Sequence, residues 1–300
     1  MDEVKVVTVA VATLWTKPQL PPRPVDAPVL GNPVDMEAWL EGLDYEKRLA
    51  CCTDHLIQSQ LLYGEKVLVL EETGDWARVV VPGQPCSKDE RGYPGWIPAV
   101  QLGDVVVASS EQQAIVVKAF APLYEKKDEE VLKLSFQTWL PVASIDGEWV
   151  EVATPHGSRW LRSEDVEVIE HDSLRGGGKE VVCAAEMFLD LPYLWGGMSA
   201  YGYDCSGLAY NMVRSIGVII PRDASDQIKV GKRVEEADVQ PGDLLFFAYE
   251  EGKGAVHHVG IYHGDGKMIH SPKTGRTVEI IDLAGTIYEK ELCGIRRYWD

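Results

Sequence analysis

The chain has 300 residues, of which 45% are apolar and 9% aromatic, a composition typical of an ordinary globular protein. This length predicts two or three domains. The formal net charge of −18 is concentrated in the first 174 residues, which hold 29 Asp and Glu against 15 Lys and Arg. Because such a field repels polyanions, we expect no nucleic-acid partner, and a ligand group that is an amine rather than a phosphate.

The first apolar stretch argues against a membrane-spanning or secretory segment. Val6–Trp15 is interrupted by Thr8 and Thr13 and is too short to cross a bilayer. It follows Met1-Asp2-Glu3 rather than a cationic region, unlike a signal peptide. We therefore expect no membrane partner and a cytoplasmic location; secretion or attachment to the cell wall is the alternative if a leader was removed.

The six cysteines show no C-x-x-C spacing and no clustering with His, so we expect no metal and no cofactor. Cys183 lies in a helical apolar pattern and Cys293 in a strand pattern. Buried free thiols are therefore favoured over three disulfides. The cysteines are Cys51, Cys52, Cys86, Cys183, Cys205 and Cys293.

Two stretches within the first 170 residues repeat each other. Gly74–Pro82 aligns with Gly147–Pro155 at a constant offset of 73 residues, and Ala12–Lys17 echoes Ala121–Lys126. In both copies, turn residues separate short runs rich in Val and aromatics, which predicts small all-β barrels. The repeat resembles the bacterial SH3-like domain, and we place the two copies at residues 1–108 and 109–172.

The first copy carries an insertion at about residues 18–58. It begins with a Pro-rich arm, and Met36, Trp39, Leu40 and Leu43 are spaced for one apolar face of a helix. An insertion of this size is more than a loop. Either it is a packing brace between domains or it shapes a binding cleft.

Residues 173–300 form a third domain after the joint Arg175-Gly176-Gly177-Gly178. The pattern predicts a helix at 179–189 and a second helix that begins at Cys205 and stops near Gly217. Strands are expected at 244–248, 256–262, 267–270, 276–281 and 294–299. Helices followed by a run of strands indicate an α+β domain with an antiparallel sheet.

Asp204-Cys205-Ser206-Gly207 at the head of the second helix is a candidate nucleophile motif. A helix N-terminus and a nearby imidazolium both lower a thiol pKa, and the thiolate is the attacking species. Taken alone, such a cysteine can also be a small buried hydrophobe. The downstream histidines His258 and His270 favour the catalytic interpretation.

Strand parity decides which histidine is the partner. His258 and His270 share a face if a three-residue loop, Gly264–Gly266, pairs His263 with Lys267 and Gly260 with His270. The rival base, His257, then alternates to the opposite face, with His263. His55, His156 and His171 are expected at the surface.

These motifs resemble those of the NlpC/p60 family of cell-wall cysteine peptidases, in matching order over about residues 178–300. With two SH3-like domains in front, almost the whole chain is similar to the bacterial gamma-D-glutamyl-L-diamino acid endopeptidases. The resemblance implies an α+β, papain-like catalytic domain preceded by two SH3-like barrels. The matching motifs are Asp204-Cys205-Ser206-Gly207-Leu208, Gly242-Asp243-Leu244, His258-Val259-Gly260-Ile261-Tyr262 and Ile269-His270-Ser271.

The resemblance implies that Cys205 is the nucleophile, His258 the base that activates it, and His270 the group that orients His258. A histidine as third member orients its neighbour but adds no fixed negative charge. The implied reaction is hydrolysis, through an acyl-enzyme, of the bond between D-Glu and the diamino acid of murein tri- and tetrapeptides. Lys and meso-diaminopimelate are both compatible, and we expect a monomer.

The resemblance further implies that the free L-Ala amine of the substrate is held by Tyr93, Glu65 and Asp223. Tyr193 and Trp195 would wall the pocket, while Ser206 and Arg222 would face the D-Glu carboxylate. Structural alternatives remain for these residues: Tyr93 and Glu65 as barrel surface, Arg222–Asp223 as an ion pair, and Trp195 as a packing residue.

Two other functions stay open. The same papain-like core supports acyl transfer or amide hydrolysis, which a thiol–imidazole pair alone does not exclude. A non-catalytic wall-binding protein could use its SH3-like pair alone, although the joint presence of Cys205, His258 and His270 argues against it.

Overall fold

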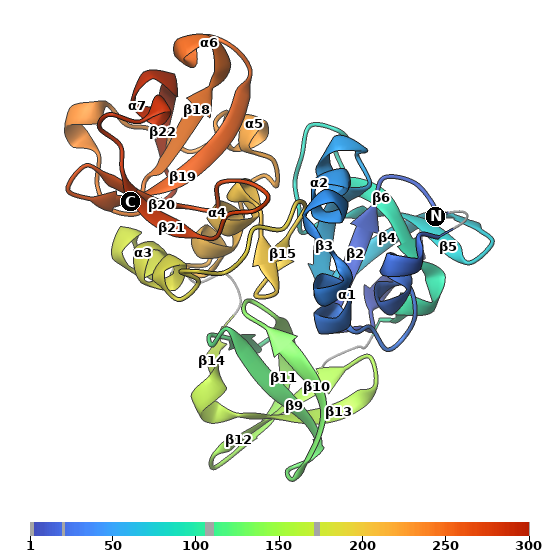
Figure 1. Ribbon diagram of the computed structural model, residues 1–300. Coiled ribbons are helices and arrows are strands. Elements are labelled where there is room, and N and C mark those ends of the chain that lie inside the picture. Colours follow the sequence, from blue (N-terminus) through green and yellow to red (C-terminus); the bar gives the residue numbers. More distant parts are fainter. Residues whose placement is uncertain (1–2, 20–21, 106–110, 171–174, 300) are drawn as a thin grey trace. The chain divides into compact units, whose positions relative to one another are not determined.

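The computed structural model describes residues 3–19, 22–105, 111–170 and 175–299, which form two compact units (Figure 1). The barrel unit comprises the described parts of Met1–Gly83 and Arg91–Ser173 together with Ser199–Tyr201. The α+β unit comprises Gln84–Glu90, the described parts of Leu174–Met198, and Gly202 onward. The predicted domain boundaries at 108/109 and 172/173, and His171, lie outside the described residues.

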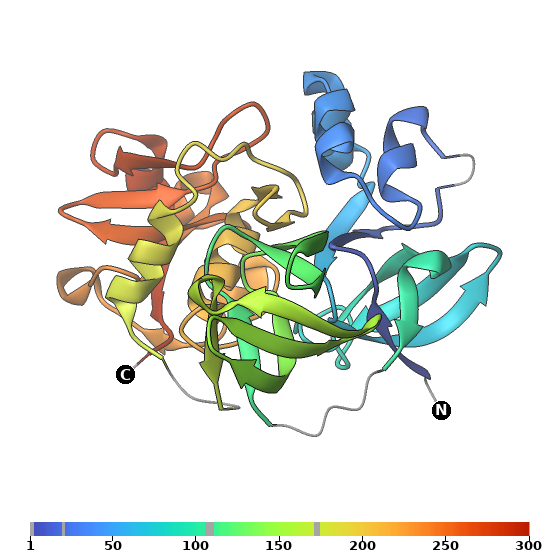
Figure 2. The same ribbon diagram turned by 90° about the horizontal axis from the view of Figure 1, so that it is seen from below.

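The barrel unit contains two seven-stranded sheets of identical topology. The first has the order β3-β2-β6-β5-β4-β1-β7, and the second repeats it as β10-β9-β13-β12-β11-β8-β14. Figure 2 shows the strands of the second sheet in shades of green. The strands of the first are β1 Glu3–Val7, β2 Val11–Trp15, β3 Ile57–Leu62, β4 Lys66–Thr73, β5 Trp76–Val81, β6 Tyr93–Pro98 and β7 Leu102–Asp104. Those of the second are β8 Gln113–Val116, β9 Phe120–Lys126, β10 Glu129–Ser135, β11 Trp139–Asp146, β12 Trp149–Thr154, β13 Gly157–Arg162 and β14 Val166–Ile169.

The sequence repeat corresponds to this structural repeat in register as well as in order. Trp76 and Trp149 each begin the equivalent strand, β5 or β12. Two residues further on, Arg78 pairs with Trp96 and Glu151 pairs with Trp160. The predicted alignment at an offset of 73 is therefore confirmed strand by strand.

The insertion lies between β2 and β3 and is largely helical. It forms the 3-10 helix η1 Pro24–Val29 and the helices α1 Met36–Gly42 and α2 Tyr45–Thr53. Trp39 is buried and donates its indole N–H to the buried Asp26 carboxylate at 3.0 Å. Lys133 of the second barrel forms an ion pair with Glu37 on α1. These contacts favour the packing-brace interpretation of the insertion.

Two short segments belong to a different unit from the residues on either side of them in the sequence. Ser199–Tyr201 is part of the barrel unit, and Gln84–Glu90 is part of the α+β unit. Within the barrel unit, Ser199 donates its hydroxyl to Gln60 at 3.0 Å, and the Ala200 N–H donates to Ser135 at 2.9 Å. Within the α+β unit, the carbonyl of Pro85 accepts the Arg222 N–H at 2.9 Å. Because these associations are tertiary, no local pattern in the sequence predicts them.

The α+β unit is built on a six-stranded sheet of order β17-β22-β18-β19-β20-β21, antiparallel at every pairing (Figure 1). The predicted α+β class is confirmed. Its strands are β17 Lys232–Arg233, β18 Leu244–Ala248, β19 Val256–Gly264, β20 Lys267–His270, β21 Glu279–Asp282 and β22 Leu292–Arg297. Its helices are α3 Gly178–Glu186, α4 Cys205–Arg214, α5 Ala224–Gln227, α6 Tyr249–Gly252 and α7 Ile287–Glu291.

Smaller elements complete the chain. The two-stranded pair β15 Met198–Ser199 and β16 Gly202–Tyr203 precedes α4, and α4 contacts β19. Three further 3-10 helices are η2 Ala99–Gln101, η3 Ser163–Asp165 and η4 Glu236–Asp238. Among the described residues, no helix is long and apolar enough to cross a membrane.

The β19–β20 hairpin has the predicted parity but not the predicted loop. Ile261 pairs with Ile269, which sets Gly260 opposite His270. At the tip, however, Gly264 pairs with Lys267, so the expected pairing of His263 with Lys267 is wrong. Asp265 and Gly266 form a two-residue turn with positive φ angles of 50° and 71°, and His263 is the extra residue of a bulge. A bulge next to a two-residue turn shifts the register as a three-residue loop would.

The start of α3 packs against the turn before β18 at a distance that only glycine allows. Gly242 has φ +93°, and a Cβ there would lie 2.3 Å from the Cα of Gly178. An added methyl group at this position therefore meets both backbone strain and a clash with backbone atoms.

We expect Gly242→Ala to lower the melting temperature of the α+β unit by about 4–12 °C, because positive φ and overpacking each cost about 1–3 kcal/mol. Gly285→Ala is the matched control, since Gly285 also has positive φ (+76°) but no atom within 4 Å of its added Cβ. The control should lose about half as much by scanning calorimetry, because it carries the positive-φ cost alone. Equal losses in both variants would show that the contact with Gly178 is unimportant.

Candidate active site

The helix α4 begins at Cys205 because Asp204 caps it. The Asp204 carboxylate accepts the Gly207 N–H at 2.7 Å, a standard N-cap bond. The same carboxylate accepts the Gly196 N–H at 2.9 Å, which ties the preceding loop to the helix start. Gly207 is required here because a Cβ would lie 2.1 Å from the carbonyl oxygen of Gly197. The Asp-Cys-Ser-Gly motif thus fixes the position of the thiol.

A buried arginine holds this cap. Arg222 is 1% exposed and donates to both Asp204 oxygens, at 3.1 and 2.7 Å, and to the Ser206 hydroxyl at 2.8 Å. Arg222 thus forms an ion pair with Asp204, and Asp223 forms one with Lys88, at 3.1 Å. Since Arg222 and Ser206 lie in a buried network with Asp204, their contact with a substrate carboxylate stays a prediction.

His258 and His270 form a buried, hydrogen-bonded pair. Nε2 of His258 lies 2.8 Å from Nδ1 of His270, and the two residues are 3% and 1% exposed. The predicted shared face is therefore confirmed. His257 is a bulge residue, since Val256 and His258 pair with Ala248 and Phe247. Its ring stacks on Tyr249 and bonds Glu291 at 3.1 Å, so it is not the partner of His270.

The resting thiol and imidazole are both neutral. Burial, aided by the Asp204 charge, raises the pKa of Cys205 to about 12, although backbone hydrogen bonds from Val259 and Ser206 act the other way. Burial lowers the pKa of His258 well below its usual value, with smaller contributions from His270 and His257. The thiol pKa is raised rather than lowered in the resting state, so that prediction is wrong. The helix start carries the Asp204 carboxylate, and the neighbouring His258 is not an imidazolium.

Tyr288 on α7 closes the histidine pair from one side and has no counterpart in the sequence prediction. Its ring centroid lies 5.2 Å from the rings of both His258 and His270. Burial raises its pKa to about 12, with a further contribution from Cys205. Its neutral phenol thus shares the apolar surroundings that keep His258 uncharged. A lone Tyr in the loop-like stretch before β22 carried no signal that would have identified it.

The predicted amine-binding residues belong to different units. Tyr93 on β6 and Glu65 lie in the barrel unit, and Asp223, just before α5, lies in the α+β unit. Tyr93 is only 2% exposed and donates to Gln58 at 3.4 Å, so barrel surface is the wrong description of it. Glu65 is half-buried and accepts the Leu62 N–H at 3.1 Å.

The loop before α4 carries the two predicted wall residues. Tyr193 is buried, and its N–H donates to the Arg276 carbonyl at 2.9 Å; Trp195 is half-buried. Both precede the Gly196 N–H that Asp204 binds. This loop is therefore held at the helix start that bears Cys205.

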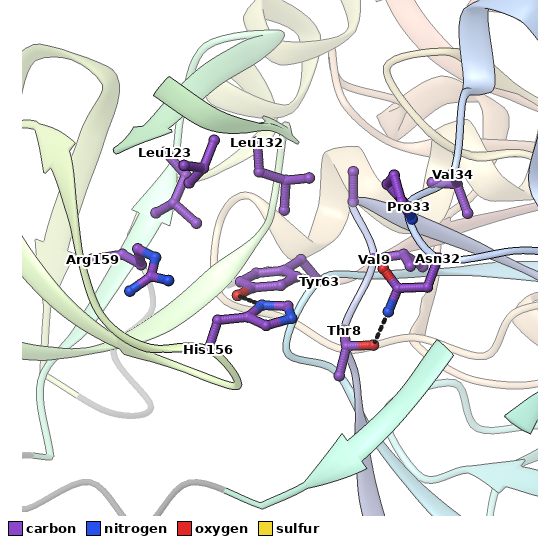
Figure 3. Close-up of a pocket in the computed structure, with 12 residues that line it drawn as sticks. Thr8, Val9, Asn32, Pro33, Val34, Tyr63, Leu123, Leu132, His156 and Arg159 are labelled. Carbon is purple, nitrogen blue, oxygen red and sulfur yellow. Dashed lines mark hydrogen bonds between the residues drawn. The ribbon is translucent and has the colours of Figure 1, made fainter. Parts of the chain in front are cut away.

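A separate cavity of about 240 Å³ lies in the barrel unit (Figure 3). There the Tyr63 hydroxyl meets Nδ1 of His156 at 2.8 Å. None of the predicted site residues lines it. His55 and His156 are exposed, as expected.

All six cysteines are free, as predicted, but the expected burial holds only for Cys51. Cys183 is exposed on the outer side of α3, and the other four are half-buried. Across the part of the chain that the structure describes, no group of three or more His, Cys, Asp or Glu side chains is arranged to hold a metal ion.

Comparison with known proteins agrees with this geometry. Residues 190–297 match the NlpC/P60 family model, and residues 116–168 match the YKFC SH3b2 domain model. The chain is 48% identical, over 96% of both chains, to the gamma-D-glutamyl-L-lysine dipeptidyl-peptidase of Bacillus subtilis. It is 39% identical to the Bacillus cereus protein of the same name, over 99% of this chain and 91% of that one.

A crystal structure of an NlpC/P60 family protein from Bacillus cereus superposes with a TM-score of 0.94 at 38% identity, covering 99% of this chain and 100% of that one. The similarity thus extends over both barrels as well as the domain that holds Cys205. Together with the near full-length relatives, it shows that this chain belongs to the NlpC/P60 family.

Proposed function

We propose that this protein is a cysteine peptidase that cleaves the bond between gamma-D-Glu and the diamino acid of murein peptides bearing a free N-terminal L-Ala. The observation that carries the proposal is the hydrogen-bonded pair His258–His270 beside the capped Cys205 helix start. The names of the near full-length Bacillus relatives support the same bond and substrate class.

Acylation begins with a neutral pair. Nε2 of His258 is engaged by His270, so Nδ1 is the nitrogen that takes the thiol proton. The Cys205 sulfur bonds the gamma-carbonyl carbon of D-Glu, and the oxyanion faces the Cys205 N–H at the helix start. His258 then returns the proton to the diamino acid nitrogen as the carbon–nitrogen bond breaks, leaving a thioester.

Deacylation reverses these roles. Water gives a proton to His258 Nδ1 and bonds the thioester carbon, and the carbon–sulfur bond then breaks. The Cys205 sulfur leaves as the thiolate and recovers the proton from His258. The enzyme returns to its neutral thiol and imidazole, in accord with the pKa directions of both groups.

Recognition of the free amine rests on Asp223. Asp223 has a side chain 29% exposed, and a lysine ammonium, that of Lys88, already pairs with it. A carboxylate that accepts one ammonium in this position suits another, so we assign the substrate amine to it. A peptide without this charge leaves the carboxylate without its cationic substrate partner.

We place the reaction in the cytoplasmic recycling of peptides already released from the wall. The net charge of −18 disfavours association with anionic wall polymers and suits small soluble peptides. Lys and meso-diaminopimelate both fit this proposal.

L-Ala-gamma-D-Glu-L-Lys and its N-acetylated form test the proposal directly. We expect cleavage of the free peptide at the D-Glu–Lys bond, with kcat/KM at least about 10-fold higher than for the acetylated one, because acetylation removes the charge that Asp223 binds. Equal cleavage of both would contradict the amine anchor.

The nucleophile has its own control in this assay. Cys205→Ala should abolish cleavage, whereas Cys183→Ala, which removes an exposed thiol on α3, should leave it unchanged. Full activity of Cys205→Ala would contradict the mechanism. Transfer of the acyl group to an added amine, rather than to water, would favour the acyltransferase alternative.

Lys88 should compete with the substrate amine for Asp223. Removing it by Lys88→Met should lower KM for the free peptide about two- to fivefold, the range expected for a partly exposed ion pair, with no effect on the acetylated peptide. Lys229→Met is the matched control, since Lys229 pairs with the neighbouring Asp226 at 2.7 Å. A higher or unchanged KM in Lys88→Met would show that Lys88 and the amine do not share Asp223.

A further inference from the structure

A carboxylate stands at the far end of the histidine pair. In the β20–β21 register His270 pairs directly with Glu279, so both side chains lie on one face of the sheet. Nε2 of His270 lies 3.4 Å from Oε1 of Glu279. His270 is 1% exposed, and the Glu279 side chain is 24% exposed. The third member of the site therefore has a negatively charged neighbour.

Glu279 is itself held in place. Arg276, three residues earlier, donates through one nitrogen to both carboxylate oxygens, at 2.8 and 2.5 Å. These charge-assisted hydrogen bonds fix the orientation of the Glu279 carboxylate. Burial lowers the pKa of His270 to about 4. The Glu279 charge opposes this shift, and the Arg276 charge adds to it. At neutral pH, His270 is therefore an uncharged imidazole with a single ring proton.

The position of that proton decides what His258 can do. The 2.8 Å contact between Nε2 of His258 and Nδ1 of His270 holds one proton, supplied by either ring. If His270 supplies it, His258 carries its own proton on Nδ1 and cannot accept one from the thiol. If His258 supplies it, Nδ1 of His258 has a lone pair ready for the Cys205 proton. Only the second arrangement is productive.

We propose that Glu279 is a positioning residue that selects this productive arrangement and stabilises the imidazolium that forms during acylation. With its charge 3.4 Å away, Glu279 favours the proton on Nε2 of His270, an atom that has no hydrogen-bond partner among the described residues, and thereby leaves Nδ1 of His270 to accept from His258. The inference rests on the proposed function, whose base is His258. No proton reaches Glu279: the thiol proton stops at Nδ1 of His258, and the carboxylate acts through its charge.

Other titratable groups lie around the His258–His270 pair. Tyr288 from α7 presents a phenol whose pKa lies near 12, and it stays neutral over the range of interest. His257 bonds Glu291, and Cys205 is a neutral thiol. Arg276 is a permanent cation that opposes protonation of His270. Glu279 is thus the group among these that favours positive charge on the pair.

Glu279→Gln keeps the shape of the side chain and removes its charge. We expect kcat/KM at its plateau to fall about 10- to 100-fold, as for other residues that orient a reacting histidine. The sign of the pH effect follows from the charge: Glu279 raises the pKa of the imidazole pair, so its loss lowers that pKa. The acid limb of kcat/KM, which rises as His258 becomes neutral, should therefore move to lower pH.

The matched control is Glu186→Gln. It removes a carboxylate that pairs with a surface histidine, His263, at 2.8 Å. Its plateau should stay within about twofold of the wild type and its acid limb should not move, because the histidine pair lies elsewhere. Thermal unfolding of both variants confirms that they are folded. A lower plateau in Glu279→Gln with an unmoved acid limb would overturn the proposal in favour of a merely structural role.

Nitrogen-15 NMR of the histidine rings tests the same point without any substrate. We expect the proton of His270 on Nε2 in the wild type and a mixture of the two ring protonation forms in Glu279→Gln. A wild-type protein with that proton on Nδ1 would overturn the proposal. If the wild type cleaves no murein peptide, the proposed function fails, but the ring-nitrogen measurement still decides the role of Glu279.

Discussion

The buried ion pair between Asp204 and Arg222 is the interaction on which the candidate site depends. Asp204 caps α4, binds the loop at Gly196 and accepts two bonds from Arg222. Removing one partner of such a pair leaves an uncompensated buried charge, at a cost of about 3–5 kcal/mol. The pair therefore links the start of α4 to the loop eight residues before Asp204 and to Arg222, 18 residues after it. It also places a negative charge beside Cys205, which keeps the thiol protonated until a base receives its proton.

Sheet register supplies the rest of the site. Antiparallel pairing aligns β19, β20 and β21 so that His258, His270 and Glu279 lie in a row across one face. A slip of one residue in either pairing would send a member of this row to the other face. Two bulges, at His257 and His263, set the register instead of the loop length alone. They also remove both neighbouring histidines from the row.

How much of this was predictable depends on the range of the interaction. The repeat, the α+β class and the strands 244–248 and 267–270 follow from local pattern, and the structure has them in place. The bulges at His257 and His263 leave no such pattern in the sequence. They change which residues pair across the strands, but the side chains alternate between the two faces as usual on either side of them. The pairing of Arg222 with Asp204, 18 residues away, was not predicted, because it depends on the tertiary packing that buries both side chains. Lys88 and Glu279 were missed because only tertiary pairing places them.

The α+β unit holds its proposed binding residues and its proposed catalytic residues in different surroundings: the former are partly exposed to solvent and the latter are largely buried. Asp223 and Lys88 are partly exposed, so their attraction is screened, and in our proposal a substrate amine replaces the lysine at small cost. Burial raises the pKa of Cys205 and lowers that of His258, so in the proposed mechanism an ion pair between them forms only during acylation. The sequence suggested that a histidine as third member leaves the site without a fixed negative charge. In our proposal Glu279 supplies that charge one strand further out, where Arg276 orients the carboxylate and Nε2 of His270 lies 3.4 Å from it. In this proposal His270, between His258 and Glu279, transmits the effect of a carboxylate charge to the base. In other triads the carboxylate contacts the base directly.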